Sequence, residues 1–157
     1  ALETAGYVGD HLNELAGIGN KEPDPAAKAK QFARQFVERA FRRPLTESEA
    51  KAHVDRLFGS TGDTVLGVKR VVVAALIAPQ FLYRDAEPGA EGFAVAARLS
   101  FALWDSVPDA ALLTAAKDGK LTTRDDIRAQ ADRMLSDPRA KAKMLAFFPA
   151  WLRLDHA

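Results

Sequence analysis

The stretch VLGVKRVVVAALIAPQFLYR (residues 65–84) contains the densest apolar run of the sequence, VVVAALIA at positions 71–78. A segment that is apolar on all sides must be buried, either in a protein core or in a membrane. The run has eight residues, whereas a membrane-spanning helix needs about 20 predominantly apolar residues. We therefore expect no membrane span here. The stretch predicts a central buried helix, with Val72 and Leu76 facing the protein interior.

Two further helices should precede this central helix. Residues 26–43 repeat apolar side chains at helical spacing, and Pro44 disfavours helical geometry at the residue before it. Thr46 and Glu49 then have the spacing of a capping box, in which each side chain binds the backbone amide of the other residue. A helix over residues 46–58 follows, and Asp63 is placed to cap the central helix.

The second half of the chain shows the same helical pattern after the turn-rich segment DAEPGAEG (residues 85–92). Helices are expected over residues 93–104, from Ser106 to Gly119 with Pro108 and Asp109 in the first turn, after a cap at Thr122 or Thr123, and from Asp137 and Pro138 onward. Pro149 predicts a kink or an early stop in the last helix. The side chains expected to point inward from the last two helices are Ile127, Ala131, Met134, Leu135, Met144, Leu145, Phe148, Trp151 and Leu152.

The predicted fold class is all-α, because no window shows sustained strand alternation. We expect about seven helices in two packed helical modules, residues 26–84 and 93–157, joined by a linker over 85–92. The first 25 residues are expected to form an N-terminal arm, in which Tyr7, Val8, Leu12 and Leu15 line one face of a short helix.

Charge and cysteine content exclude several function classes. Lys and Arg number 22 and Asp and Glu 21, so the net charge of +1 gives no field that would favour nucleic acid or an anionic membrane. The chain has no cysteine, which excludes disulfides, thiolate catalysis, Cys-ligated metals and covalent c-type haem attachment within it. We expect no cofactor in this chain.

No catalytic or metal-binding set is evident. Glu49 and His53 have a spacing that could place two ligands on one metal, but the capping role explains Glu49. His11 with Glu14 and the terminal His156 are equally isolated. The carboxylates Asp109, Asp125, Asp126 and Asp137 all stand at predicted helix starts, where they stabilise the helix dipole. The sequence also lacks a GxSxG motif and a phosphate-binding GxxxxGK[ST] loop.

Arginines at element ends are the more informative charged residues. Arg42, Arg43 and Arg84 end predicted elements, and Arg98 stands among apolar residues. A partly buried Arg usually pairs with a carboxylate or binds helix carbonyls, which favours structural bracing. An anion or partner contact is the functional alternative. A helix-turn-helix over residues 26–58 is disfavoured because its second helix carries acidic residues.

Four phrases occur in a characteristic order: FARQFVERAFRRPLTESEA (32–50), LIAPQFLYR (76–84), ARLSFALWDSVPDAALL (97–113) and ADRMLSDPRAKAKMLAFFPAWLRL (131–154). Together they resemble the paired helical modules of unknown function found in large planctomycete-type secreted proteins. In that family the modules stand beside c-type cytochrome-like and carbohydrate-binding-like domains. The resemblance therefore implies a periplasmic or extracellular location and haem on the parent protein.

The resemblance also selects residues and implies a longer protein. It carries over Arg42, Arg43 and Arg84 in the first module and Arg98, Trp104 and Trp151 in the second, as candidates for interaction or bracing. It carries over no catalytic residue. The second module of the family continues past the Trp-Leu phrase, so we expect this chain to be truncated. Pro149 departs from the family pattern.

Three functions follow as hypotheses. The first is a non-catalytic helical scaffold or interaction module of a large exported, redox-associated protein, whose partners are other domains of that protein or other proteins. The second is a part of an exported oxidoreductase whose active site is completed by missing domains. The third is a helical nucleic-acid-binding module, which the charge balance disfavours.

Overall fold

The structure is a computed structural model, and it describes residues 1–83 and 89–152. The described residues form ten helices and no strand, if the continuous helix over residues 47–58 is counted once, and this confirms the predicted all-α class. The chain divides into two compact units, residues 1–84 and 85–157, which are described separately below. Three helices exceed the predicted number of about seven: α1 (Leu2–Asp10), α2 (Leu12–Leu15) and α7 (Pro79–Leu82). Each is short, and the last is a single turn that Pro79 begins.

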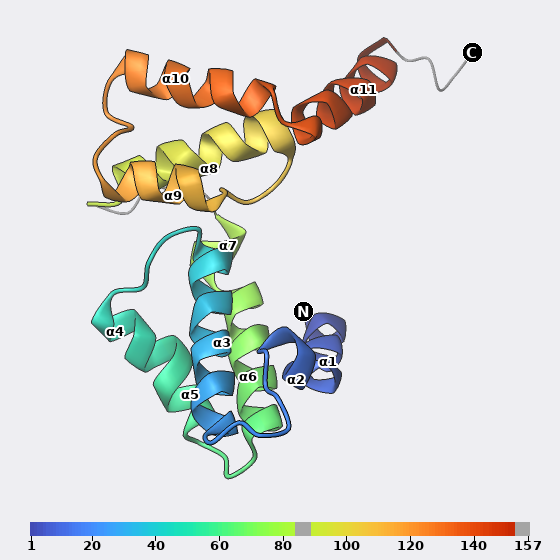
Figure 1. The fold of residues 1–157 in the computed structure, drawn as a ribbon, viewed down its shortest axis with the longest axis vertical. Helices are drawn as coiled ribbons and strands as arrows, with labels where there is room; N and C mark the ends of the chain where they lie inside the picture. The colour runs from blue at the N-terminus through green and yellow to red at the C-terminus, as the bar shows by residue number, and fades with distance from the viewer. Residues whose placement is uncertain (84–88, 153–157) are drawn as a thin grey trace. The chain divides into compact units, whose positions relative to one another are not determined.

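Unit 1 is built around α6 (Thr64–Ile77), the helix predicted from the apolar run (Figure 1). Val68, Val71, Val72 and Ala75 are completely buried, and Leu76 packs against the same core. These burials confirm the predicted inward face. Neighbouring α1 and α3 (Pro25–Phe41) pack on α6, as does the short α5 (Arg56–Phe58). The Asp63 carboxylate caps α6 by accepting from the Val65 amide at 2.8 Å, as predicted.

The corner between α3 and the next helix follows the predicted local pattern. Arg42 ends α3 in a left-handed conformation (φ 61°), one residue earlier than expected. Thr46 and Glu49 form the predicted capping box at the start of α4 (Glu47–Ala50). The helix continues through a π-helical segment, η1 (Lys51–Asp55), into α5. Nothing in the residue spacing indicated this π-helical turn.

The N-terminal residues pack on the core of unit 1. Val8 and Leu12 are buried, whereas Tyr7 and Leu15 are 59% and 42% exposed, and the four residues lie on two helices, α1 and α2, rather than on one as expected. Gly9 permits a close helix approach: an added Cβ would lie 1.8 Å from Cε of Lys69, whose aliphatic stem crosses α1. The Lys69 ammonium then lies 3.4 Å from the carboxylate of Asp10.

Unit 2 contains four helices, namely α8 (Glu91–Trp104), α9 (Ala110–Lys117), α10 (Arg124–Leu135) and α11 (Pro138–Leu152). Its core includes Trp104, Leu112 and Met134. Asp109 caps α9 from the position before the helix, rather than from within its first turn, and Thr123 forms a capping box with Asp126. Leu135 was expected inside but is 55% exposed.

The last helix differs most from expectation. α11 runs through Pro149 to Leu152, so the predicted early stop is wrong. Ala140 in its first turns is buried, and Lys143 donates to the Phe101 carbonyl at 2.6 Å. Beyond these contacts, α11 extends away from α8, α9 and α10 (Figure 1). The five side chains that were expected to face inward from α11 are therefore all exposed: Met144, Leu145, Phe148, Trp151 and Leu152.

No helix within residues 1–83 and 89–152 is long and apolar enough to cross a membrane.

Candidate functional site

Arg42 joins the end of α3 to α7. Its residue is only 6% exposed, and its guanidinium donates to the carbonyl oxygens of Gln80 at 2.7 Å and Tyr83 at 3.1 Å. The last carbonyls of a helix lack intrahelical partners and form the negative end of the helix dipole. A buried cation at this place satisfies those acceptors. Arg42 therefore acts as a brace within unit 1.

Arg43 and Glu49 form a bidentate ion pair at the same corner. The two N–O distances are 2.8 and 2.7 Å, and both side chains are largely buried. The Glu49 carboxylate also accepts from the backbone amide and the hydroxyl of Thr46, each at 2.9 Å. The Arg43 hydrogen bond, acting against burial and helped by Thr46, lowers the pKa of Glu49 to about 2. This carboxylate stays ionised and engaged, which is unsuitable for a general acid.

His53 and His11 each make a ring contact with a neighbouring aromatic side chain. His53 meets the Phe41 ring edge-on, with ring centroids 5.2 Å apart. His11 stacks on Tyr7 at 4.2 Å. Within residues 1–83 and 89–152, no three His, Cys, Asp or Glu side chains lie close enough to hold a metal ion. His156 lies outside the described residues.

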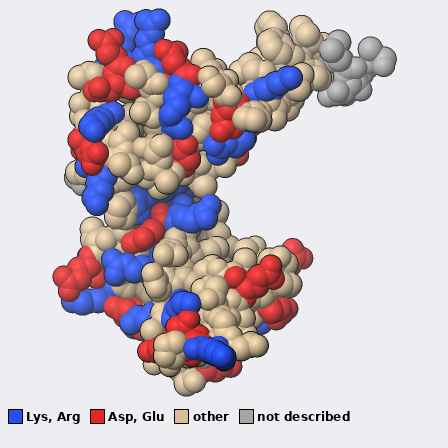
Figure 2. Space-filling model, viewed as in Figure 1, with Lys and Arg blue, Asp and Glu red and all other residues tan. Residues whose placement is uncertain are grey.

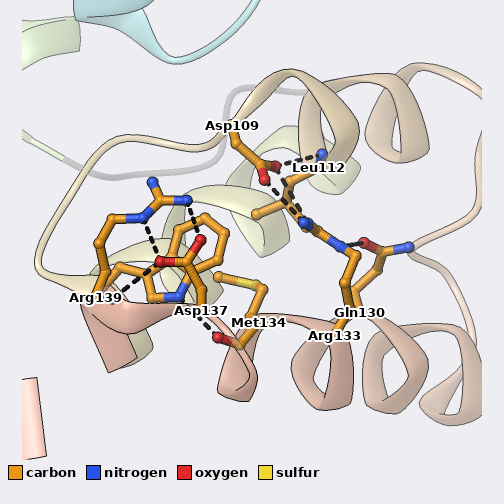
Figure 3. A network of polar contacts seen from close by, with 8 residues as sticks. Asp109, Leu112, Gln130, Arg133, Met134, Asp137 and Arg139 are labelled. Atoms are coloured by element: carbon orange, nitrogen blue, oxygen red, sulfur yellow. Dashed lines mark hydrogen bonds and ion pairs between the residues drawn. The ribbon is translucent and has the colours of Figure 1, made fainter. Parts of the chain in front are cut away.

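A second cluster of polar contacts lies in unit 2 and includes Asp109, Arg133, Asp137 and Arg139 (Figure 3). Trp104 lies beside both arginines. The indole Nε1 donates to the Met134 carbonyl at 3.0 Å, at the end of α10. The Arg139 guanidinium lies 3.6 Å from the centroid of the Trp104 ring and forms a two-point ion pair with Asp137, at 2.9 and 2.8 Å. Hydrogen bonding by Arg139 lowers the pKa of Asp137 to about 2.

Asp109 connects this cluster to α9. Its carboxylate accepts from the Leu112 amide at 2.8 Å and from Arg133 of α10 at 2.8 and 3.2 Å. Arg133 is in turn held by the side-chain oxygen of Gln130 at 3.0 Å (Figure 3). Burial raises the pKa of Asp109, but the hydrogen bonds from Arg133 and Leu112 outweigh it, and the pKa lies below its ordinary value.

We call Trp104, Asp109, Arg133, Asp137 and Arg139 the Trp104 cluster. Its chemistry is that of a structural support. Each carboxylate in it is bonded to a guanidinium, and both carboxylate pKa values are lowered, so neither group is prepared to exchange protons near neutral pH. The contacts tie α8 to α10, α9 to α10 and the start of α11 to α8. Among the predicted candidates, Trp104 is thus placed as a bracing residue.

The remaining predicted candidates belong to different units or lie outside the described residues. Arg98 lies on the exposed side of α8, in unit 2, whereas Arg42 and Arg43 belong to unit 1. Trp151 is 66% exposed near the end of α11. Arg84 lies outside the described residues. The described candidates therefore comprise three residues in bracing contacts, Arg42, Arg43 and Trp104, together with the exposed Arg98 and the exposed Trp151.

Trp151 belongs to the most prominent exposed apolar surface of unit 2. We define the α11 apolar face as Met144, Leu145, Phe147, Phe148, Trp151 and Leu152. Exposure of these side chains ranges from 40% for Met144 to 66% for Trp151. Phe147 stacks on Trp151 with ring centroids 6.0 Å apart and meets Phe148 edge-on at 5.6 Å. In Figure 2 the part of α11 next to the grey residues is accordingly almost entirely tan.

Sequence reasoning missed this surface because it treated large apolar residues as core. A signal was nevertheless present. The segment MLAFFPAWL (144–152) has no charged residue, and its three smaller residues, Ala146, Pro149 and Ala150, separate three pairs of large apolar ones. Such a segment needs cover on most sides, and unit 2 covers only the start of α11.

Comparison with known protein families finds one matching family model in each half of the chain. Residues 28–85 match the family model PSD5, "Protein of unknown function (DUF1595)". Residues 91–157 match the model PSD4, "Protein of unknown function (DUF1592)". The chain thus carries two family-model domains of unknown function, which agrees with the paired modules that the four phrases indicated. No curated protein and no solved structure matched the chain.

Proposed function

We propose that this chain is a non-catalytic helical interaction module of a larger exported protein, in which the α11 apolar face is the binding surface. The observation that carries the proposal is the exposure of six large apolar side chains along nine residues of one helix. Monomeric soluble proteins rarely expose large contiguous apolar patches, and such patches mark sites of interaction. Aromatic residues are also enriched in the energetically dominant parts of interfaces.

The polar groups of the two units support a binding rather than a catalytic role. Arg42, Arg43 and Arg139, together with Glu49 and Asp137, are engaged in contacts within their own units. These contacts hold helices in place. The rigid arrangement is what an interaction surface requires from its scaffold, because a preorganised surface loses less conformational entropy on binding.

The larger protein, its export and its association with haem domains rest on the resemblance described above. The mass of the native protein tests the first point, since a module of a larger protein predicts a mass well above 17.0 kDa. The full reading frame tests the others, and it should contain an export signal and CxxCH-bearing segments. A reading frame that lacks both would contradict an exported, redox-associated parent.

Amide hydrogen exchange tests the binding surface itself. If α11 is covered in the native protein, residues 144–152 should exchange more slowly there than in the dilute 157-residue chain. Helix α3 is the internal control and should exchange equally in both, because its apolar side is already buried within unit 1. Equal exchange of α11 in both samples would contradict the proposal.

A further inference from the structure

We propose that the α11 apolar face binds the same face of a second copy of the chain, with the two α11 helices antiparallel. This inference rests on the proposed function and names its partner. It follows from the shape of the apolar face, from the distribution of charge along α11 and from the area available.

The apolar face is a single broad stripe. Successive residues of a helix are rotated by about 100°, so the six side chains fall within an arc of roughly 160°. Met144, Phe148 and Trp151 follow the i, i+4, i+7 spacing along the middle of the stripe, and Phe147 and Leu145 lie at its two edges. A stripe of this kind fits a second helix that carries a matching stripe.

Charge selects the antiparallel arrangement. Helix α11 contains no acidic residue, and its three cations, Arg139, Lys141 and Lys143, all lie in its first half. Parallel helices would place these cations side by side, which is repulsive. Antiparallel helices place the cations of the two copies at opposite ends of the contact, so that they do not face one another. A two-fold axis between the copies gives this arrangement.

The aromatic side chains provide a centre for the contact. Phe147, Phe148 and Trp151 already contact one another on each copy, with centroid separations of 5.6 and 6.0 Å. Because these side chains already restrict one another's rotamers, they lose less conformational entropy when a partner binds. With Phe148 near the two-fold axis, Met144 of one helix lies opposite Leu152 of the other, because both are four residues from Phe148.

The available area predicts a weak, reversible dimer. Six large side chains that are about half exposed offer roughly 500 Å² per copy, compared with about 800 Å² per partner in a standard interface. We therefore expect association in the micromolar range or above, about 1–100 μM. Sedimentation velocity of the 157-residue chain over this range should show a monomer–dimer equilibrium.

Substitutions locate the interface. Phe148→Ser or Trp151→Ser should weaken dimerisation by at least tenfold, about 1.4 kcal/mol. Ile77→Ser is the matched control, because Ile77 is similarly exposed (61%) but belongs to α6. Far-UV circular dichroism should show unchanged helicity in all three variants. A dimer that resists both α11 substitutions would overturn the proposal, as would a dimer lost equally with Ile77→Ser.

Cross-linking tests the orientation, and it is clean because the chain has no cysteine. A mixture of Met144→Cys and Leu152→Cys chains should form disulfide-linked heterodimers in preference to either homodimer. Preferential homodimers would indicate parallel helices and overturn the inference.

Two outcomes separate this inference from the proposed function. A chain that stays monomeric throughout the concentration range overturns self-pairing, whereas slow exchange of α11 in the native protein would still support a binding surface. Vesicles of phosphatidylcholine test a lipid surface as the alternative occupant. Flotation of monomeric chain with these vesicles, abolished by Trp151→Ser, would also overturn self-pairing.

Discussion

The Glu49 carboxylate receives hydrogen bonds from Arg43 and Thr46, and these contacts make unit 1 sensitive to acid. The pKa of Glu49 is about 2 in the folded chain, compared with an ordinary value of 4.5. Because the folded pKa is depressed, the stabilisation is complete above pH 4.5 and is lost as the pH falls toward 2. The difference between these two pKa values corresponds to about 3 kcal/mol of stabilisation at neutral pH, and the low exposure of the pair limits screening by solvent.

Glu49→Gln should therefore destabilise unit 1 by about 2 kcal/mol at pH 7 and by much less at pH 2. Unfolding by urea, followed by far-UV circular dichroism from pH 7 to pH 2, measures this difference. Glu47→Gln is the control, since Glu47 is 83% exposed in its ion pair with Lys51 and should have little effect. Parallel pH profiles for the two variants would refute the role assigned to Glu49.

At the scale of helices, Gly67 lies close to the backbone of another helix of unit 1, whereas Gly6 does not. The two glycines should therefore differ in whether they tolerate substitution by alanine. A Cβ on Gly67 of α6 would lie 3.2 Å from the carbonyl oxygen of Phe58 at the end of α5, whereas a Cβ on Gly6 of α1 meets nothing within 4 Å. Gly6→Ala should stabilise unit 1 by up to about 1 kcal/mol through helix propensity. Gly67→Ala should destabilise it by about 1 kcal/mol, because the crossing must widen. Thermal unfolding of both variants checks the opposite signs, and stabilisation by Gly67→Ala would contradict the close crossing.

Two substitutions of Asp109 at the start of α9 distinguish the free energy of helix capping from that of ion pairing. Asp109 caps the helix through the Leu112 amide and also pairs with Arg133. Asp109→Asn retains a good cap and loses the charge, so it should cost about 0.5–1 kcal/mol, whereas Asp109→Ala loses both and should cost about 1–2 kcal/mol. Denaturant unfolding of unit 2, followed by tryptophan fluorescence, measures the two losses. Equal losses would mean that capping contributes nothing.

Sequence reasoning predicted those features of the helices that depend on neighbouring residues. The capping box at Thr46, the cap at Asp63 and the buried face around Val72 were found because their causes lie within one or two helical turns. The carbonyl contacts of Arg42 join residues about forty positions apart, so no local pattern could show them. The outward α11 was missed for a related reason. Periodicity identifies an apolar stripe such as that of Phe148 and Trp151, but it does not show whether the same chain covers it.

At the scale of the whole molecule, the two units have separate hydrophobic cores. The first core is formed by residues between Ala5 and Ala78, and the second by residues between Ala96 and Ala140. The braces obey the same division, because Arg42 binds carbonyls of unit 1 and Arg139 lies on Trp104 of unit 2. We therefore expect residues 1–84 to fold without unit 2. Expressed alone, this segment should be helical and should unfold cooperatively on heating.

The aromatic residues allow the two units to be followed separately in the intact chain. Both tryptophans, Trp104 and Trp151, lie in unit 2, whereas unit 1 contains the two tyrosines, Tyr7 and Tyr83, and no tryptophan. Glu49→Gln should consequently shift the part of the far-UV transition that belongs to unit 1 and leave the tryptophan transition in place. If the substitution shifts the tryptophan transition by the same amount, the two units unfold in one cooperative transition. Their folding free energies are then coupled. Independent transitions would instead mean that each family-model domain carries its own folding free energy, so an interaction at α11 would stabilise unit 2 alone.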